Sequence, residues 1–63
     1  MRANLKKMRI KNGYTQTEIA NKLGVTTRQY QYMEAGTSNG SVTVWKQLRD
    51  ILGAESIDQL YEN

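Results

Sequence analysis

The sequence contains no cysteine and no histidine among its 63 residues. Without them, neither a disulfide framework nor a Cys/His metal cluster can stabilise a small core. General acid–base and nucleophilic chemistry lose their commonest side chains, the carboxylates are few and scattered, and no glycine-rich phosphate loop is present. We therefore expect no enzyme activity, no metal site and no cofactor.

Long apolar runs are also absent. No stretch approaches the ~20 residues that a membrane-spanning helix needs, and the first residues lack the apolar region and cleavage site of a secretory signal. The lack of cysteine is compatible with a reducing cytosol. We expect a cytoplasmic protein with no membrane contact.

The length allows one core and no second functional module. The sequence is thus predicted to form a single domain over residues 1–63. A core of this size contributes only a few kcal/mol of net stability, so regular local structure or dimerisation must supply the remainder.

The charge balance is basic, with a formal net charge of +3 and a sequence pI near 9.5. Basic residues crowd into the first eleven positions: Arg2, Lys6, Lys7, Arg9 and Lys11. Such a cluster favours a polyanionic partner. It is equally consistent with the solvated face of an exposed helix, so charge alone does not decide the function.

Glycines and capping residues divide the chain into helical segments, and no run alternates apolar and polar residues as a strand does. The first helix is predicted over 3–12, with Leu5, Met8, Arg9 and Asn12 on its inward face and Gly13 as its stop. Thr15 and Glu18 have the spacing of a capping box, so a second helix starts there, and Gly24 ends it.

Three further helices follow the same logic. Thr26 is an N-cap for a helix that runs to about Ala35, and a polar loop from Thr37 to Gly40 comes next. The fourth helix is capped by Ser41 and stopped by Gly53, and its predicted inward residues are Val42, Trp45, Leu48 and Leu52. Residues 56–59 form a second predicted capping box before a short fifth helix.

The segment from Gln16 to Met33 carries the functional signal. Its two helices are joined by a turn too tight for antiparallel packing, so they must cross steeply. Ala20 allows the close approach, Gly24 supplies the positive φ of the turn, and Val25 fills the corner. Together with apolar Tyr30, this pattern is typical of a helix-turn-helix that binds DNA.

The chain resembles the lambda-type repressor and Cro-like family of helix-turn-helix regulators, also called Xre-like. The matching positions run from about Leu5 to Leu60 and include Met8-Arg9, Gly13-Tyr14-Thr15-Gln16, Glu18-Ile19-Ala20, Leu23-Gly24-Val25, Glu34-Ala35-Gly36 and Leu52-Gly53. The resemblance implies a compact, all-α, five-helix domain whose second and third helices form the helix-turn-helix, with double-stranded DNA as the partner.

The sequence departs from the family pattern in three places. Tyr30 replaces a β-branched or leucine-like residue, so either the third helix sits further out or the phenol reaches the surface. Gly40 replaces the proline common before the fourth helix, and Arg49 replaces a small residue within it. These substitutions affect what can be expected of residues 36–49.

The outward face of the third helix supplies the predicted base contacts. With Tyr30, Met33 and Glu34 inward, Thr27, Arg28, Gln31 and Tyr32 project to the other side. Arginine can fork onto guanine, glutamine can pair with an adenine edge, and threonine can meet a thymine methyl. The alternatives are a phosphate contact or solvation for Arg28, and a half-buried surface aromatic for Tyr32.

Phosphate contacts are predicted around this helix. In the family the first residue of the second helix donates to a phosphate, and Gln16 matches it, beside helix N–H groups and the positive end of the dipole. The loop after the third helix often contacts phosphate as well. The predicted set is Gln16, Thr26, Thr37, Ser38 and Asn39, and for the loop an ordinary surface role remains equally open.

Arg9 and Glu34 are two charges on inward faces, and buried charges persist only when paired. We expect them to form a salt bridge, as the family does at the matching positions. Its predicted role is structural: it holds the third helix at its angle without contacting bases.

These features predict a sequence-specific transcriptional regulator, of the phage or mobile-element repressor type, that acts as a homodimer on a pseudo-palindromic operator and lies on the nucleoid when bound. Weak self-association is expected through Ile51, Ile57 and Tyr61, and no small-molecule effector is expected. The alternative is a protein-interaction module, such as an antitoxin or adaptor, that uses the aromatic residues Tyr14, Tyr30, Tyr32, Trp45 and Tyr61.

Overall fold

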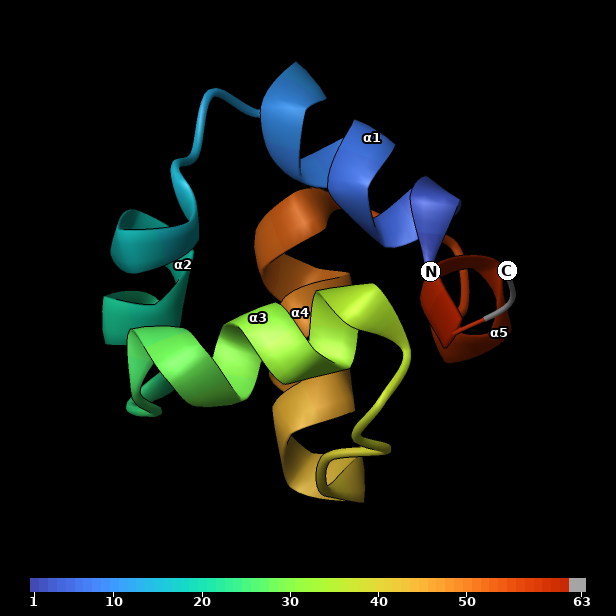
Figure 1. Ribbon diagram of the computed structural model, residues 1–63. Helices are drawn as coiled ribbons and strands as arrows, with labels where there is room; N and C mark the ends of the chain where they lie inside the picture. Colours follow the sequence, from blue (N-terminus) through green and yellow to red (C-terminus); the bar gives the residue numbers. More distant parts are fainter. Residues whose placement is uncertain (62–63) are drawn as a thin grey trace.

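The computed structural model describes residues 1–61. It contains five helices: α1 (Ala3–Lys11), α2 (Gln16–Leu23), α3 (Thr27–Ala35), α4 (Val42–Leu52) and α5 (Ile57–Tyr61) (Figure 1). No strand occurs within these 61 residues, and the predicted all-α, five-helix fold is confirmed. The predicted domain, 1–63, includes two residues, 62 and 63, that lie outside the described part of the chain.

Matching capping boxes begin the two helices of the helix-turn-helix. The Glu18 amide donates to Thr15 Oγ1 at 3.1 Å, and the Thr15 amide donates to Glu18 Oε1 at 3.0 Å, which confirms the predicted box. At the start of α3, Thr26 and Gln29 exchange the same pair of bonds, each 3.0 Å long. The Thr26 cap was predicted from the sequence, but its return partner, Gln29, was not. The starts of α2 and α3 are therefore fixed by the same device.

The predicted capping box of α5 is only half formed. The Gln59 amide donates to Ser56 Oγ at 3.3 Å, as a cap requires. The return bond goes elsewhere, because Gln59 Oε1 accepts from the Glu55 amide at 3.0 Å instead of from Ser56. The side chain thus ties down the residue before the cap.

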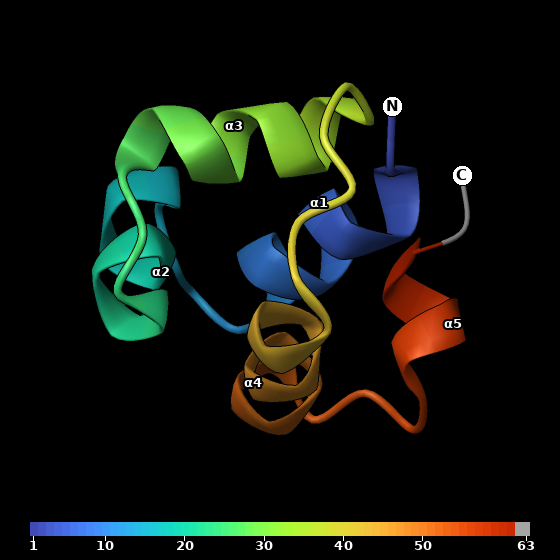
Figure 2. The same cartoon turned by 90° about the horizontal axis from the view of Figure 1, so that it is seen from below.

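The corner between α2 and α3 depends on Gly24, whose φ of 72° lies in the left-handed region. That conformation turns the chain so that the Val25 amide donates back to the Ala20 carbonyl at 3.1 Å. Val25 is half-buried against the core. After this corner α3 runs along the edge of the molecule, as Figure 2 shows.

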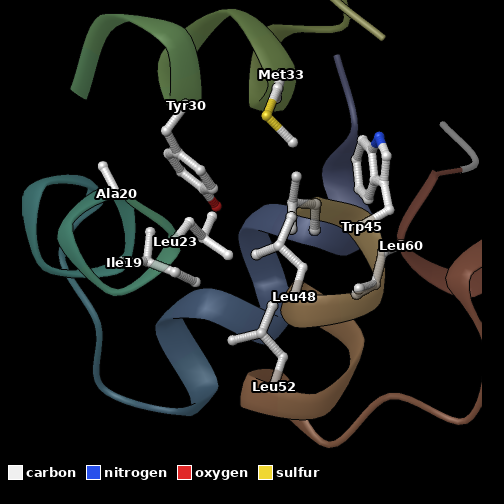
Figure 3. Packing of buried hydrophobic residues seen from close by; sticks show 10 residues of the cluster. Ile19, Ala20, Leu23, Tyr30, Met33, Trp45, Leu48, Leu52 and Leu60 are labelled. Carbon is white, nitrogen blue, oxygen red and sulfur yellow. The ribbon is translucent and has the colours of Figure 1, made fainter. Parts of the chain in front are cut away.

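The core lies between α3 and α4, with α2 to one side and α1 and α5 completing the enclosure (Figures 1 and 2). Figure 3 shows Tyr30 and Met33 pointing from α3 towards Leu23, Leu48 and Trp45. The buried apolar side chains come from every helix: Leu5, Ile19, Ala20, Leu23, Tyr30, Met33, Trp45, Leu48, Leu52 and Leu60.

Two residues predicted to face inward do not. Val42 is 67% exposed, because α4 begins beyond the edge of the core, and Val44 is the half-buried valine instead. Asn12 is also exposed, but its amide donates to the Leu52 carbonyl at 3.2 Å. It therefore links the end of α1 to the end of α4 at the surface.

Candidate nucleic-acid interface

The outer face of α3 is polar and accessible. Arg28, Gln31 and Tyr32 are exposed, whereas Tyr30, Met33 and Glu34 on the opposite side are buried. Thr27 is half-buried, so less of it is open than the sequence pattern predicted. The structure therefore places three of the four predicted base-contacting residues fully on one open helix face, with the fourth at its edge.

Two residues predicted to have separate roles contact each other. Gln31 Nε2 donates to Gln16 Oε1 at 3.2 Å, and Gln16 Nε2 lies 3.5 Å from Glu34 Oε1. The start of α2 is thus joined by side chains to the middle and the end of α3. The sequence offered no local signal for this contact, because it depends on how the two helices cross.

A shallow hollow of about 430 Å³ opens beside α3. It is lined by the first residue of the chain and by residues of α1, the start of α2 and α3: Met1, Lys6, Arg9, Gln16, Gln31, Glu34 and Ala35. The predicted site residues omit Met1, Lys6 and Ala35, and Lys6 is the charged one among them. A signal was present, since Lys6 lies three residues before Arg9 and so shares its side of the helix.

Arg9 and Glu34 are brought together at the inner side of this hollow. Arg9 Nε is 2.9 Å from Glu34 Oε2, Nη2 is 3.2 Å from Oε1, and Nη1 donates to the Tyr14 carbonyl at 2.8 Å. Both residues are buried. The hydrogen bonds to Glu34 raise the pKa of the Arg9 guanidinium and outweigh the opposing effect of burial. The pair joins α1 to the last turn of α3.

Tyr30 is fully buried next to this ion pair, and its hydroxyl makes no hydrogen bond within the described residues. Burial raises the pKa of the phenol. The negative charge of the nearby Glu34 carboxylate raises this pKa further, although the two groups form no hydrogen bond. The sequence left open whether the phenol reaches the surface. It does not, and the ring instead fills the space under α3 (Figure 3).

Arg2 has a different position from the one its charge suggested. It is 4% exposed, and its guanidinium donates to the carbonyls of Met33 and Ser38, the latter at 2.8 Å. Arg2 Nε also donates to the Tyr61 carbonyl at 3.2 Å. Arg2 is one of the basic residues that crowd into the first eleven positions, but its charge is buried and is not part of a solvated basic face.

The polar loop after α3 is tied to its surroundings. Thr37 Oγ1 donates to the Tyr32 carbonyl at 3.2 Å, and Ser38 Oγ accepts from the Gly40 amide at 3.3 Å. Asn39 accepts from Trp45 Nε1 through its carbonyl. Of the predicted phosphate contacts, Thr26, Thr37 and Asn39 are exposed, while Ser38 and Gln16 are half-buried.

Gly40 has a structural reason for replacing the proline of the family. Its φ is +66°, which proline cannot adopt, and a Cβ there would stand 3.0 Å from Met33 Cε and 3.2 Å from Trp45 Nε1. The loop thus passes closely over the core before Ser41 caps α4 with a 3.2 Å bond from the Val44 amide.

The described residues offer no group of three or more His, Cys, Asp or Glu side chains able to hold a metal ion. Among the same residues, no helix has the length and apolar character needed to cross a membrane.

A comparison with protein-family models matches residues 5–60 to a helix-turn-helix family of the Cro/C1 type. The chain belongs to this helix-turn-helix family. The predicted family resemblance is confirmed, and the chain is a DNA-binding helix-turn-helix regulator whose partner is double-stranded DNA. The helix-turn-helix family is a regulatory family and not an enzyme family. Comparisons with curated proteins and with solved structures found no match.

Proposed function

We propose that this helix-turn-helix protein is a sequence-specific transcriptional repressor, of the phage or mobile-element type, that inserts α3 into the major groove. The observation that supports it most is the division of α3: Arg28, Gln31 and Tyr32 lie open to solvent while Tyr30, Met33 and Glu34 fix the helix from behind. A helix held in this way presents polar side chains without having to reorganise on binding.

Each exposed residue of α3 is given a role by its chemistry. Arg28 forks onto the O6 and N7 acceptors of a guanine, and Gln31 meets an adenine edge with the amide hydrogen that Gln16 does not use. Tyr32, which is 49% exposed, packs its ring on a thymine or a sugar. Thr27, at the edge of the face, contributes a methyl group to a thymine contact.

Phosphate contacts flank this face on both sides. Gln16 is the first residue of α2, where backbone N–H groups and the helix dipole favour an anion. Thr26 begins α3, and Thr37, Ser38 and Asn39 follow its end. Contacts on both sides of the helix would set its depth and register in the groove without reading sequence.

The Arg9–Glu34 pair acts as a brace in this proposal. It connects α1 to the last turn of α3, and both side chains are buried away from the outer face. A brace of this kind fixes the angle at which α3 leaves the body of the domain, and neither residue needs to touch a base.

Repressor action is proposed to use a weak homodimer on a pseudo-palindromic operator, because two helices about 34 Å apart read more sequence than one. Tyr61 of α5 is 38% exposed, and Ile51 of α4 and Ile57 of α5 are half-buried. No cofactor or small-molecule effector is required, and the protein would lie on the nucleoid in the cytoplasm.

The rival proposal, an antitoxin or adaptor that binds protein, has less support from the aromatic residues. Tyr30 and Trp45 are buried and Tyr14 is half-buried, which leaves only Tyr32 and Tyr61 exposed. A salt series separates the two functions. DNA binding through several phosphates weakens steeply between about 50 and 200 mM salt, whereas an apolar protein interface barely responds.

Selection of bound sites from a random duplex library tests the proposed function. The unsubstituted protein should select a two-fold symmetric site, and Arg28→Ala should relax the preference at one position of each half-site at a cost of about 1–3 kcal/mol. Lys46→Ala, which removes an exposed charge on α4, is the matched control and should keep the selected site. Uniform weakening by Arg28→Ala would make Arg28 a phosphate contact, and no enriched site would overturn sequence-specific binding.

A further inference from the structure

Arg2 lies where the end of α3, the loop after it and the end of α5 meet. Its backbone amide donates to the Glu34 carbonyl at 2.8 Å, so the chain just before α1 is bonded to the last turn of α3. Its Nη1 donates to the carbonyls of Met33 and Ser38, the second at 2.8 Å. A positive charge at carbonyls from the C-terminal turn of a helix is favoured by the helix dipole.

Two aromatic rings hold the same guanidinium in place. Arg2 Cζ lies 4.4 Å from the centre of the Tyr61 ring and 5.2 Å from that of Trp45, and the two rings meet edge to face at 5.2 Å. Arg2 Nε donates to the Tyr61 carbonyl at 3.2 Å. Because rings and carbonyls both contact a group that is only 4% exposed, its orientation is set from several directions.

The guanidinium also determines how Asn39 presents its amide. Arg2 Nη2 lies 3.4 Å from Asn39 Oδ1, so the accepting half of this amide faces the protein. The Asn39 carbonyl is engaged as well, by Trp45 Nε1. The donating half, Nδ2, remains for an outside partner, and a donor is what a phosphate requires. Asn39 is exposed although buried groups hold it on two sides.

We propose that Arg2 is a positioning residue for the DNA interface. It touches no DNA itself. It fixes the loop 37–39 against the end of α3 and turns the Asn39 amide so that Nδ2 donates to a backbone phosphate. This inference rests on the proposed function, because it specifies how one of the predicted phosphate contacts is preorganised. It requires the fork of an arginine, since a lysine ammonium cannot reach separate acceptors in one plane.

The test compares Arg2→Met with Lys46→Met in the full chain. Both variants lose one positive charge, but Lys46 is exposed on α4 and none of the loop bonds involves it. The probe is a mixed-sequence duplex of about 20 base pairs, roughly two turns of B-DNA. Affinity is measured from about 50 to 200 mM salt, and each value is corrected for the folded fraction obtained from urea unfolding.

For Arg2→Met we expect the folded molecules to bind roughly tenfold more weakly at every salt concentration, because a hydrogen bond to a charged phosphate is lost. The slope of log affinity against log salt should stay the same, because the Asn39 amide is neutral and neutralises no phosphate charge. Lys46→Met should keep the affinity of the unsubstituted protein. A merely structural role for Arg2 would reduce the folded fraction but leave the affinity of the folded molecules unchanged, so a corrected Arg2→Met affinity equal to that of Lys46→Met would overturn the inference.

Arg2→Lys keeps the measurement possible should the methionine variant not fold. Combined with Asn39→Ala it forms a double-mutant cycle. Asn39→Ala should weaken binding roughly tenfold when Arg2 is present and cause no further weakening beside Arg2→Lys. Equal weakening in both backgrounds would overturn the coupling. If the unsubstituted chain bound no duplex at any salt concentration, the proposed function would fail first, which is a distinguishable outcome.

Discussion

Arg9 and Arg2 are both buried where α1 meets the rest of the molecule, but their partners differ in kind. Arg9 faces the carboxylate of Glu34, in a forked contact at 2.9 and 3.2 Å. Arg2 faces carbonyl oxygens, one side-chain amide and two aromatic rings. A charged partner makes a pair that fails when either member is removed, whereas neutral partners share the interaction among many groups.

The largest effect expected from this difference follows from Glu34→Ala. The substitution leaves the Arg9 guanidinium buried without its counter-charge, which typically costs about 3–5 kcal/mol. Urea unfolding should show most of the domain's stability lost. The double variant Arg9→Met with Glu34→Leu should recover part of the loss, because no charge is then buried. A single Glu34→Ala variant as stable as the unsubstituted protein would contradict the brace.

Arg2→Met should have a smaller effect on unfolding, about 2 kcal/mol. Methionine retains apolar contact with Trp45 and Tyr61. The groups that lose their donor, the carbonyls of Met33, Ser38 and Tyr61, are neutral, so no charge is left buried without a partner. The urea midpoints of Arg2→Met and Glu34→Ala, measured under one buffer condition, test the ranking. A larger loss for Arg2→Met would mean that the neutral partners matter more for stability than the ion pair.

Tyr30→Phe probes the space beside the charged pair and should change stability by at most about 1 kcal/mol, in the stabilising direction. The hydroxyl that it removes is buried without a hydrogen-bond partner in the described residues, and the ring that fills the core is retained. Thermal unfolding measures the change. A clear destabilisation would indicate that the hydroxyl supports the Arg9–Glu34 geometry.

The smallest effect is expected from the two capping boxes, which differ in the same way. The return partner is the charged carboxylate of Glu18 in one box and the neutral amide of Gln29 in the other. Bonds from Thr15 lower the pKa of Glu18 from its ordinary value of 4.5. Because the pKa of Glu18 is lower in the folded protein than in the unfolded chain, its carboxylate stabilises the fold above pH 4.5. This contribution is lost as the pH falls through the pKa of the folded state. Glu18→Gln, which copies the Thr26–Gln29 box, should remove this part of the acid sensitivity. Urea midpoints between about pH 3 and 6 measure it.

Local signals were enough to predict most of the fold. Thr15 with Glu18 and the glycine at 24 mark helix ends through bonds within a few residues, so their meaning does not depend on distant packing. Val42 shows where this fails. Helical spacing put it on the inward face, but α4 extends past the core, and spacing alone does not reveal where a core ends.

The site was predicted less completely because its contacts span helices. Arg9 and Glu34 were paired from opposite charge and family resemblance, both of which are visible in a sequence. The buried position of Arg2 was not predicted. A signal existed, because the inward stripe of Leu5 and Arg9, extended back by three residues, reaches Arg2. The acceptors of its guanidinium are mostly backbone carbonyls. Because every residue has a carbonyl group, the residue types in the sequence do not indicate which of them accept. The Gln16–Gln31 bond was missed because it depends on the crossing of α2 and α3.

Gly40 has a consequence for how this protein can vary. It is exposed, and a ranking of positions by solvent accessibility would treat it as freely replaceable. Its left-handed backbone and the close approach of Met33 and Trp45 instead restrict the position to glycine or nearly so. In a library that randomises every surface position, residue 40 should thus retain its identity as strictly as the core does. The identity of a residue in an exposed polar loop would then be constrained by the buried side chains that it covers.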